Sequence, residues 1–548
     1  MEAENIVRQF RQILLWPLQL MPLEAGPQIR DLWEVLTQSG QDGAWREIED
    51  EFTSDPNQFG ERHYAEFAYF LPFVQRFLYG DAGVSQRASG TAKSPIRAFR
   101  RGDVAKARVT HRHGEKPIDF DVAHVDLYFF HDIDIVILAV EIHARDLSME
   151  SVTETLEGFR RAYPVSWEKS GRAARCPDRV EWLSPRGEVL AASDYEQRAK
   201  YLPYVCVHKA PRFSSHWEYL LRPLVPAHLS DDKRLLRYKQ AEDDRIPVMS
   251  YLAVEDARRI TRGDFARLAF AVKRGRSDTL PYSARFLEDF ESKYCYDRFW
   301  DPTEDHGWAG ARYLCSGSVF SMVGNASDAP YIDPETGLLS KFRHQYFLLG
   351  LIAHFHKAAL LMLSDRLSMA VGKLDPRDAK STLEFQREVR QYLEVFLRFT
   401  HRYWFHEISN QIQARDLFKM WSKHLGNDEL YAEVREEVQD INNYLDSRRA
   451  KKLADIGMRL GVVATLGFIG VFVTGFFGMN VYSFGEGSLT ARTLVLLIVF
   501  GLAIALTLYT ISISKALANF LDAVSSDRLT WGQKYDALLD VWRKPRRG

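Results

Sequence analysis

The sequence predicts an α/β cytoplasmic domain, followed by long stalk helices and a C-terminal hairpin of two transmembrane helices. Three observations support this fold class. Two runs without charged residues lie near the C-terminus, a helix-forming segment without Pro or Gly precedes them, and β-branched segments alternate with helical ones upstream. A chain of 548 residues exceeds one ordinary hydrophobic core, so we expect more than one folded unit.

Composition excludes several classes of protein. Hydrophobic residues make up 46% and charged residues 26% of the chain, a balance that excludes global disorder. The 72 basic and 73 acidic side chains leave a net charge of −1, so we expect no nucleic-acid partner. The four cysteines are widely spaced, which favours a reducing compartment over a disulfide scaffold or a zinc ribbon.

Residues 1–335 are predicted to form the α/β domain, with α+β as the alternative. Val125–Phe130 and Ile135–Ile142 flank the polar turn H-D-I-D and are predicted to form a hairpin. The Asp-, Pro- and Gly-rich segment 327–340 ends the domain. Further strands are predicted over residues 203–208, 246–253 and 313–323, and helices over residues 149–163 and 254–272.

Residues 336–456 are predicted to form a helical stalk. One helix is expected over residues 341–371, and a second over residues 377–425. The apolar stretch Tyr346–Leu363 could be mistaken for a membrane span. It carries His354, His356 and Lys357 at its middle, so we predict a buried helix of a soluble domain.

A third helix is predicted to begin at Asn427, which can cap it, after Gly426 has ended the second. No Pro or Gly interrupts the chain from Asp428 to Ile456, so this helix should continue into the first span. A helix of about 50 residues is about 75 Å long. No other element of a single chain would cover such a helix along its whole length. This is a first indication that the protein is an oligomer. A packing stripe repeats along it at Leu430, Val434, Val438, Ile441 and Leu445.

Residues 457–515 are predicted to form the transmembrane hairpin. The runs 460–479 and 493–514 contain no charged residue, and each is long enough to cross a bilayer and contact membrane lipid. Basic residues flank the hairpin on both sides, whereas the loop between the spans carries only Arg492. The positive-inside rule therefore places both termini in the cytoplasm, with residues 516–548 as a cytoplasmic tail. We expect an integral protein of the plasma (inner) membrane.

Motifs for catalysis are missing, so the chain is not expected to be an enzyme. There is no P-loop, dinucleotide fingerprint, H-E-x-x-H or G-x-S-x-G. Two other sets are weighed as metal or phosphate sites, with a solvated loop and a plain turn as the favoured alternatives: His111 with His113, and Glu242, Asp243 and Asp244.

The first span ends in T-G-F-F-G-M-N, which places Gly478, Met479 and Asn480 at the outer membrane boundary. A carboxamide oxygen can accept a cation or its water shell without holding it as tightly as a carboxylate would. Asn480 is therefore the candidate metal ligand. The alternative is an ordinary polar helix end, with Asn480 as a C-terminal cap.

A Gly-Met-Asn motif that closes the first of two C-terminal spans, after a long charged helix, resembles the CorA-type divalent-cation (magnesium) transporters. The chain is similar to a large, bacterial-like member of that family. The resemblance implies a homopentamer with a cytoplasmic αβα funnel, in which the first span of each subunit lines the pore. Gly478, Met479 and Asn480 would form the outer selectivity ring. No cofactor is implied, because the divalent cation, Mg²⁺ in the first instance, is the cargo.

One departure from the family leaves the preferred ion open. The family often follows its motif with several acids, whereas Glu486 is the only acid of this loop. Transport of zinc, nickel or cobalt therefore remains an alternative. A membrane-tethered sensor or scaffold that no longer conducts is another.

Steps of three and four residues inward from the motif predict the pore face of the first span. Phe468 and Leu460 would be its apolar constrictions, gating by dewetting; alternatively, Phe468 faces lipid or the second span. The full set of predicted pore-lining residues is Gly475, Val471, Phe468, Ala464, Leu460 (or Gly461) and Gly457.

The resemblance also implies that stalk carboxylates sense the transported ion at subunit boundaries. A solvated acidic face, partly offset by Arg435, is the favoured alternative. The acids are Asp428, Glu429, Glu433, Glu436, Glu437 and Asp440.

Overall fold

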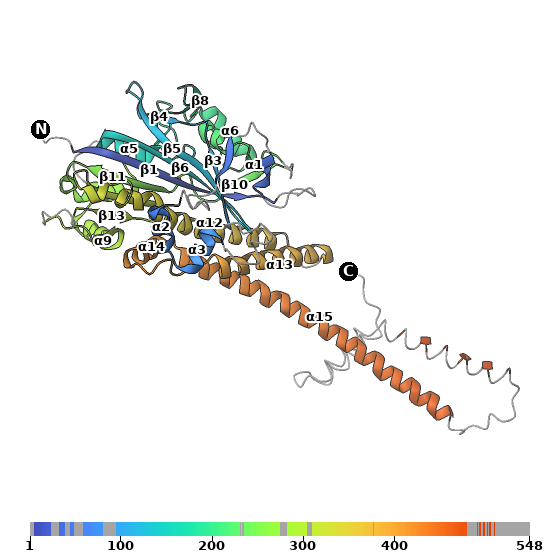
Figure 1. Cartoon of the computed structure of the whole chain (residues 1–548). Coiled ribbons are helices and arrows are strands. Elements are labelled where there is room, and N and C mark those ends of the chain that lie inside the picture. Colours follow the sequence, from blue (N-terminus) through green and yellow to red (C-terminus); the bar gives the residue numbers. More distant parts are fainter. Residues whose placement is uncertain are drawn as a thin grey trace. The chain divides into compact units, whose positions relative to one another are not determined.

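The computed structural model divides into two compact units, Met1–Glu437 and Val438–Gly548 (Figure 1). Each unit is described by itself. The described residues are 5–22, 32–38, 44–48, 59–80, 95–230, 232, 235–273, 282–303, 310–375, 378–478, 490, 493, 494, 497, 498, 501, 504, 505 and 509.

A large sheet organises the first unit. In the described residues it has 14 strands, in the order β12-β13-β14-β11-β1-β6-β5-β4-β7-β8, with β10 and β9 branching from β1, and β3 and β2 from β5. The strands are β1 (Ile6–Leu20), β2 (Trp45–Ile48), β3 (Ile96–Arg101), β4 (Lys106–Thr110), β5 (Ile118–Phe130), β6 (Ile133–Ser148), β7 (Arg179–Leu183), β8 (Val189–Ala192), β9 (Val225–Pro226), β10 (Arg237–Gln240), β11 (Val248–Val254), β12 (Cys295–Tyr296), β13 (Arg312–Cys315) and β14 (Val319–Asn325).

Most of these pairings are antiparallel, so the sheet is of the α+β kind. The parallel pairs are β11 with β14 and β9 with β10. The predicted hairpin is confirmed, because β5 and β6 pair antiparallel across a turn in which Asp132 has a φ of 65°. Strand β1 pairs with β6 from Ile6 to Gln19 and lies at the centre of the sheet.

Helices cover both faces of the central strands. Phe10, Leu14 and Trp16 of β1 belong to one core cluster, with side chains of helices α5, α7 and α8. Ile13 and Leu15 point to the opposite face by the alternation of a strand, and helix α12 packs along β1 and β6. The helices before α12 are α1 (Glu34–Gln38), α2 (Glu61–Tyr69), α3 (Pro72–Tyr79), α5 (Met149–Gly158), α6 (Arg198–His208), α7 (Ser215–Leu221), η1 (Ala257–Arg259), α8 (Arg262–Phe270), α9 (Ala284–Tyr294), α10 (Ala329–Ile332), α11 (Leu338–Lys341) and η3 (Phe342–Tyr346).

Helix α12 (Phe347–Gly372) is the buried helix that the sequence predicts. Together with α11 and η3 it forms a helical stretch, Leu338–Gly372, that is long and apolar enough to cross a membrane, alone among the helices of the described residues. The most apolar 18 residues of this stretch are 83% buried inside the protein, so it is a core helix. Helices α13 (Ala379–Arg402) and α14 (Ile412–Leu425) pack against it.

Three predicted elements are wrong. Residues 203–208 belong to helix α6 rather than to a strand; no described strand pairs with them, and Val205 and Val207 are exposed. Residues 313–323 form two strands, β13 and β14, because Gly317, with a φ of 82°, turns the chain between them. The helix predicted over residues 377–425 is broken between α13 and α14, where Ile408 and Ser409 are buried and bond to Leu71 and Tyr69.

The long stalk helix is confirmed as α15 (Asn427–Gly478), an uninterrupted helix of 52 residues and about 78 Å. Gly426, with a φ of 71°, ends α14 as predicted. Asn427 does not cap the helix with its side chain. It is fully buried, and its Nδ2 donates to the Ala353 carbonyl of α12 at 3.0 Å, which fastens the start of α15 to the core.

We predict that Trp421→Ala lowers the free energy of unfolding by about 3–5 kcal/mol. Trp421 is 1% exposed, stacks on Phe320 of β14 and donates its indole N–H to the Gly317 carbonyl at 2.8 Å. The measurement is urea unfolding of the detergent-solubilised chain. Ile412→Ala, at an exposed position of the same helix, is the control and should change stability by less than about 0.5 kcal/mol. Equal midpoints for wild type and Trp421→Ala would contradict this packing.

Candidate functional site

The predicted pore-lining residues all lie on the last turns of α15, from Gly457 to Gly478. Their spacing of three and four residues puts them on one side of the helix. Their large apolar members are strongly exposed: Leu460 is 70%, Phe468 78% and Val471 71% exposed. Side chains of this kind need cover from lipid, from another protein chain or from the second predicted span, most of which lies outside the described residues. That the cover is a pore axis stays a prediction.

Small residues recur on the same segment of α15. Gly457 and Gly461 are one helical turn apart, as are Gly475 and Gly478. A Cβ built on any of these four glycines meets no described atom within 4 Å, so intrachain packing in the described residues does not require glycine there. Small residues let neighbouring helices in a membrane approach closely. The segment thus has the composition of a helix–helix interface.

The proposed selectivity motif lies at the boundary of the described residues. Gly478 is the last described residue of α15 and the first residue of the motif. Met479 and Asn480 lie outside the described residues, as does most of the second predicted span. The roles of Met479 and Asn480 in ion selection therefore stay predictions.

The stalk acids form no metal site within the described part of one chain, where no group of three or more His, Cys, Asp or Glu side chains is close enough to hold an ion. Glu437 is half-buried and accepts a hydrogen bond from the Ser364 hydroxyl at 3.4 Å. Burial raises the pKa of Glu437, and nearby Glu433 adds to that rise. A sensing site between subunits stays a prediction.

The other candidate sets each have structural partners. His111 is buried against the Thr155 hydroxyl, whereas the His113 side chain is 97% exposed, so the two do not converge. This corrects the expectation that both lie in a solvated loop. The acids Glu242, Asp243 and Asp244 form a turn before β11, as predicted, and each pairs with a cation: Lys357, Arg245 and Arg161, respectively.

His354 and His356 are buried in helix α12 and do not form a chelating pair. The ring Nε2 of His356 lies 2.6 Å from the Tyr403 carbonyl, and Nδ1 of His354 has no hydrogen-bond partner among the described residues. Burial lowers the pKa of each to about 3, so both are neutral at physiological pH.

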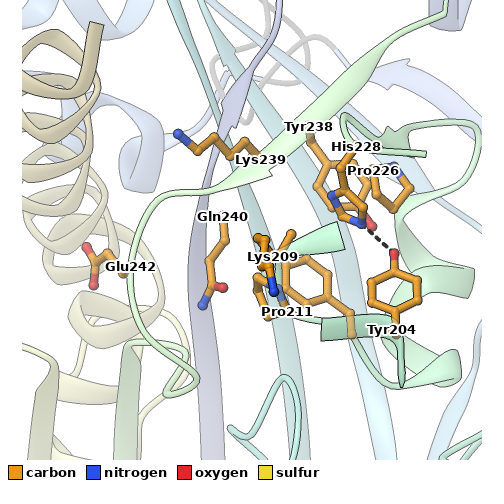
Figure 2. A pocket seen from close by; sticks show the side chains of 11 residues that line it. Tyr204, Lys209, Pro211, Pro226, His228, Tyr238, Lys239, Gln240 and Glu242 are labelled. Carbon is orange, nitrogen blue, oxygen red and sulfur yellow. Dashed lines mark hydrogen bonds between the residues drawn. The ribbon is translucent and has the colours of Figure 1, made fainter. Parts of the chain in front are cut away.

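Two cavities of the first unit were not anticipated from the sequence. The first, of about 200 Å³, is lined by the aromatic side chains of Tyr204, Phe213 and Tyr238 (Figure 2). Tyr204 lies 2.5 Å from the His228 ring, and burial raises the pKa of Tyr204 to about 12. The second, of about 350 Å³, contains Arg160 and shares Glu242 with the first. The lining of the first cavity lies within residues 204–242, spread over several short elements and loops. The lining of the second comes from segments far apart in the chain, so it has no motif.

The exposed apolar turns of the long helix α15 define the class: a chain whose last described helix needs cover from lipid or protein. A protein-family model, the CorA-like Mg²⁺ transporter protein, matches residues 378–512, which include α13, α14, α15, the first predicted span and all but the last two residues of the second. The resemblance to the CorA family seen in the sequence is therefore confirmed over residues 378–512. No curated protein and no solved structure matches the chain.

We predict that His354→Phe weakens the acid sensitivity of folding. The pKa of His354 is lowered from 6.5 to about 3, so the unfolded chain takes up a proton that the folded chain refuses. The contribution of each such neutral buried histidine to stability is complete above pH 6.5. As the pH falls below 6.5, the free energy of unfolding decreases by about 1.4 kcal/mol per pH unit for each such histidine. His354→Phe should remove one such contribution from the slope of unfolding free energy against pH.

Phe355→Leu is the control for this measurement. Phe355 neighbours His354 in the same buried helix and carries no titratable group, so its loss should lower stability equally at each pH. Identical slopes for wild type and His354→Phe would contradict a buried neutral imidazole.

Proposed function

We propose that the chain is a channel-like transporter that carries a divalent cation, Mg²⁺ in the first instance, across the plasma (inner) membrane. The observation that carries the proposal is the family match over residues 378–512. The exposed apolar turns at the end of the 52-residue helix α15 support it from the physical side. Both termini would lie in the cytoplasm, with lipid around the two spans.

The proposed assembly is a homopentamer in which α15 of each copy lines a common axis. The exposed Leu460, Phe468 and Val471 would then be covered by neighbouring copies, the pore and lipid. Asn480, with Gly478 and Met479, would form a ring of oxygen ligands at the outer mouth. A ring of neutral oxygens suits an ion that keeps its waters, as Mg²⁺ does.

No chemical reaction is needed to move the ion. An inside-negative membrane potential contributes about 4.6 kcal/mol per 100 mV for a doubly charged ion. Zinc, nickel or cobalt as the cargo, and a non-conducting sensor, are the alternatives. Flux of Mg²⁺, Zn²⁺, Co²⁺ and Ni²⁺ into proteoliposomes, reported by fluorescent dyes, distinguishes them; a well-folded oligomer without divalent flux would favour the sensor.

We predict that Asn480→Ala abolishes selective divalent flux and leaves the oligomer assembled, because in the proposed pore mouth the carboxamide would contact the ion and water and would have no packing role. Loss of a single interaction of about 1.4 kcal/mol already weakens ion binding about tenfold. Proteoliposome flux and size-exclusion chromatography with light scattering are the measurements. Asn443→Ala, the same change at an exposed stalk position, is the control. Wild-type flux in Asn480→Ala would exclude the proposed selectivity ring.

We predict that a thiol reagent blocks current through Phe468→Cys, because position 468 faces the pore. The exposed native Cys206 is first replaced by Ser, whereas Cys176, Cys295 and Cys315 are buried. Gly470→Cys is the matched control, since two residues along a helix turn the side chain by about 200°. If the current through Phe468→Cys, measured in planar bilayers, is insensitive to reagent added from either side, a pore role for this position is wrong.

A further inference from the structure

The second cavity lies in the first unit, where loops of the sheet meet helices α12 and α14. Its volume is about 350 Å³. Five segments of the chain supply its walls: Arg160 after α5; Glu242, Asp243 and Arg245 before β11; Ser316 and Ser318 between β13 and β14; Lys357 and Leu361 on α12; and His424 and Leu425 at the end of α14.

The walls of this cavity are held by close backbone contacts. A Cβ on Gly317 would lie 2.7 Å from the His424 carbonyl oxygen, so the Ser316–Ser318 turn lies directly against the end of α14. The Ile246 N–H donates to the Arg160 carbonyl at 2.8 Å, which joins two further segments of the lining. The cavity is therefore a preformed feature of the first unit, and a ligand would meet side chains already in place.

The charged lining is unbalanced. Two of its cations have carboxylate partners: Arg245 pairs with Asp243, and Lys357 lies 3.8 Å from Glu242. Arg160 has no carboxylate within ion-pair distance among the described residues. The cavity therefore carries one unpaired positive charge.

Arg160 is buried without adequate polar partners. It is 3% exposed, its Nη2 lies 3.5 Å from the Ser318 hydroxyl, and its Nε has no hydrogen-bond partner in the described residues. Burial, with Arg161 and Arg245 nearby, lowers the pKa of Arg160 to about 9. A buried cation in this state is strongly stabilised by an anion that fills its hydrogen-bonding capacity.

The carboxylate of Glu242, in contrast, lacks a hydrogen-bond donor for one of its oxygens in the described residues. Its side chain is 9% exposed, and Oε1 has no hydrogen-bond partner among the described residues. Figure 2 shows the carboxylate beside the helices, apart from the aromatic side chains of the first cavity. An oxyanion that fits beside this carboxylate must bring a hydroxyl donor. Phosphate and its monoesters carry such a proton near neutral pH, whereas sulfate does not.

We infer that the second cavity binds a phosphate-class oxyanion, either inorganic phosphate or the phosphate group of a small ester, with Arg160 as its cation and Glu242 accepting its hydroxyl. Lys357 and the Ser318 hydroxyl, which also line the cavity, supply further donors, whereas the Ser316 hydroxyl donates to the Ala269 carbonyl. The inference does not rest on ion transport, because all of these residues lie in the first unit and binding is measured directly.

The test is isothermal titration calorimetry of the full-length chain in detergent with inorganic phosphate, sulfate and glycerol 3-phosphate. We expect phosphate or the ester to bind at least tenfold more tightly than sulfate. Whichever of the two binds more tightly identifies the source of the phosphate group. No binding of either, or equal binding of phosphate and sulfate, would overturn the inference.

Three variants complete the experiment. Arg160→Gln should lose phosphate binding, and Glu242→Gln should abolish the preference for phosphate over sulfate, because a carboxamide can donate to either anion. Arg145→Gln removes an exposed arginine far along strand β6 and is the matched control, with unchanged binding.

Thermal unfolding of the same variants, with and without phosphate, separates binding from folding. Without ligand, Arg160→Gln should melt no lower than wild type, since it removes an unpaired buried charge. Phosphate should raise the melting temperature of wild type and leave that of Arg160→Gln unchanged. An equal phosphate-induced shift in both proteins would overturn the assignment of Arg160.

Discussion

The central physical constraint of this protein is a helix that its own described chain leaves uncovered. Helix α15 runs for 52 residues without Pro or Gly in its first thirty, and its final turns expose Leu460, Phe468 and Val471. Apolar surface of this extent is stable in lipid, against other chains or against the second predicted span. The family match over residues 378–512 agrees with this constraint, because the matched family is one of transporters.

The start of α15 is fixed by a core that is itself built around one apolar helix. Helix α12 packs on the central strands β1 and β6 and also on α13 and α14. Asn427 reaches from the start of α15 to the Ala353 carbonyl of α12. Gly350 of α12 leaves room for Trp421, whose ring would lie 2.7 Å from an added Cβ. The turn at Gly317 also contacts α14, because Trp421 donates its indole N–H to the Gly317 carbonyl at 2.8 Å.

Buried polar groups in this core differ in how well they are satisfied. Asp244 pairs with Arg161, whereas Arg160, the residue directly before Arg161, lacks a carboxylate partner in the described residues. An uncompensated buried charge is costly, and a bound anion would compensate the charge of Arg160. The cavity beside it opens between the sheet and the stalk helices, close to the residues that lead into α15.

The sequence by itself determined the features that depend on local pattern. The absence of Pro and Gly after Asp428 predicted α15, Gly426 predicted its boundary, and the polar turn between two β-branched runs predicted the β5–β6 hairpin. Only tertiary structure decided the rest. The second half of strand β1, residues 13–18, is a continuous apolar run with Pro17 inside. Both of its faces are buried, which removes the alternation that identifies a strand. The break after α13 exists because Ile408 and Ser409 bond to residues more than 300 positions earlier, and the Arg160 cavity is assembled from five distant segments. Contacts of this range leave no periodicity in the sequence.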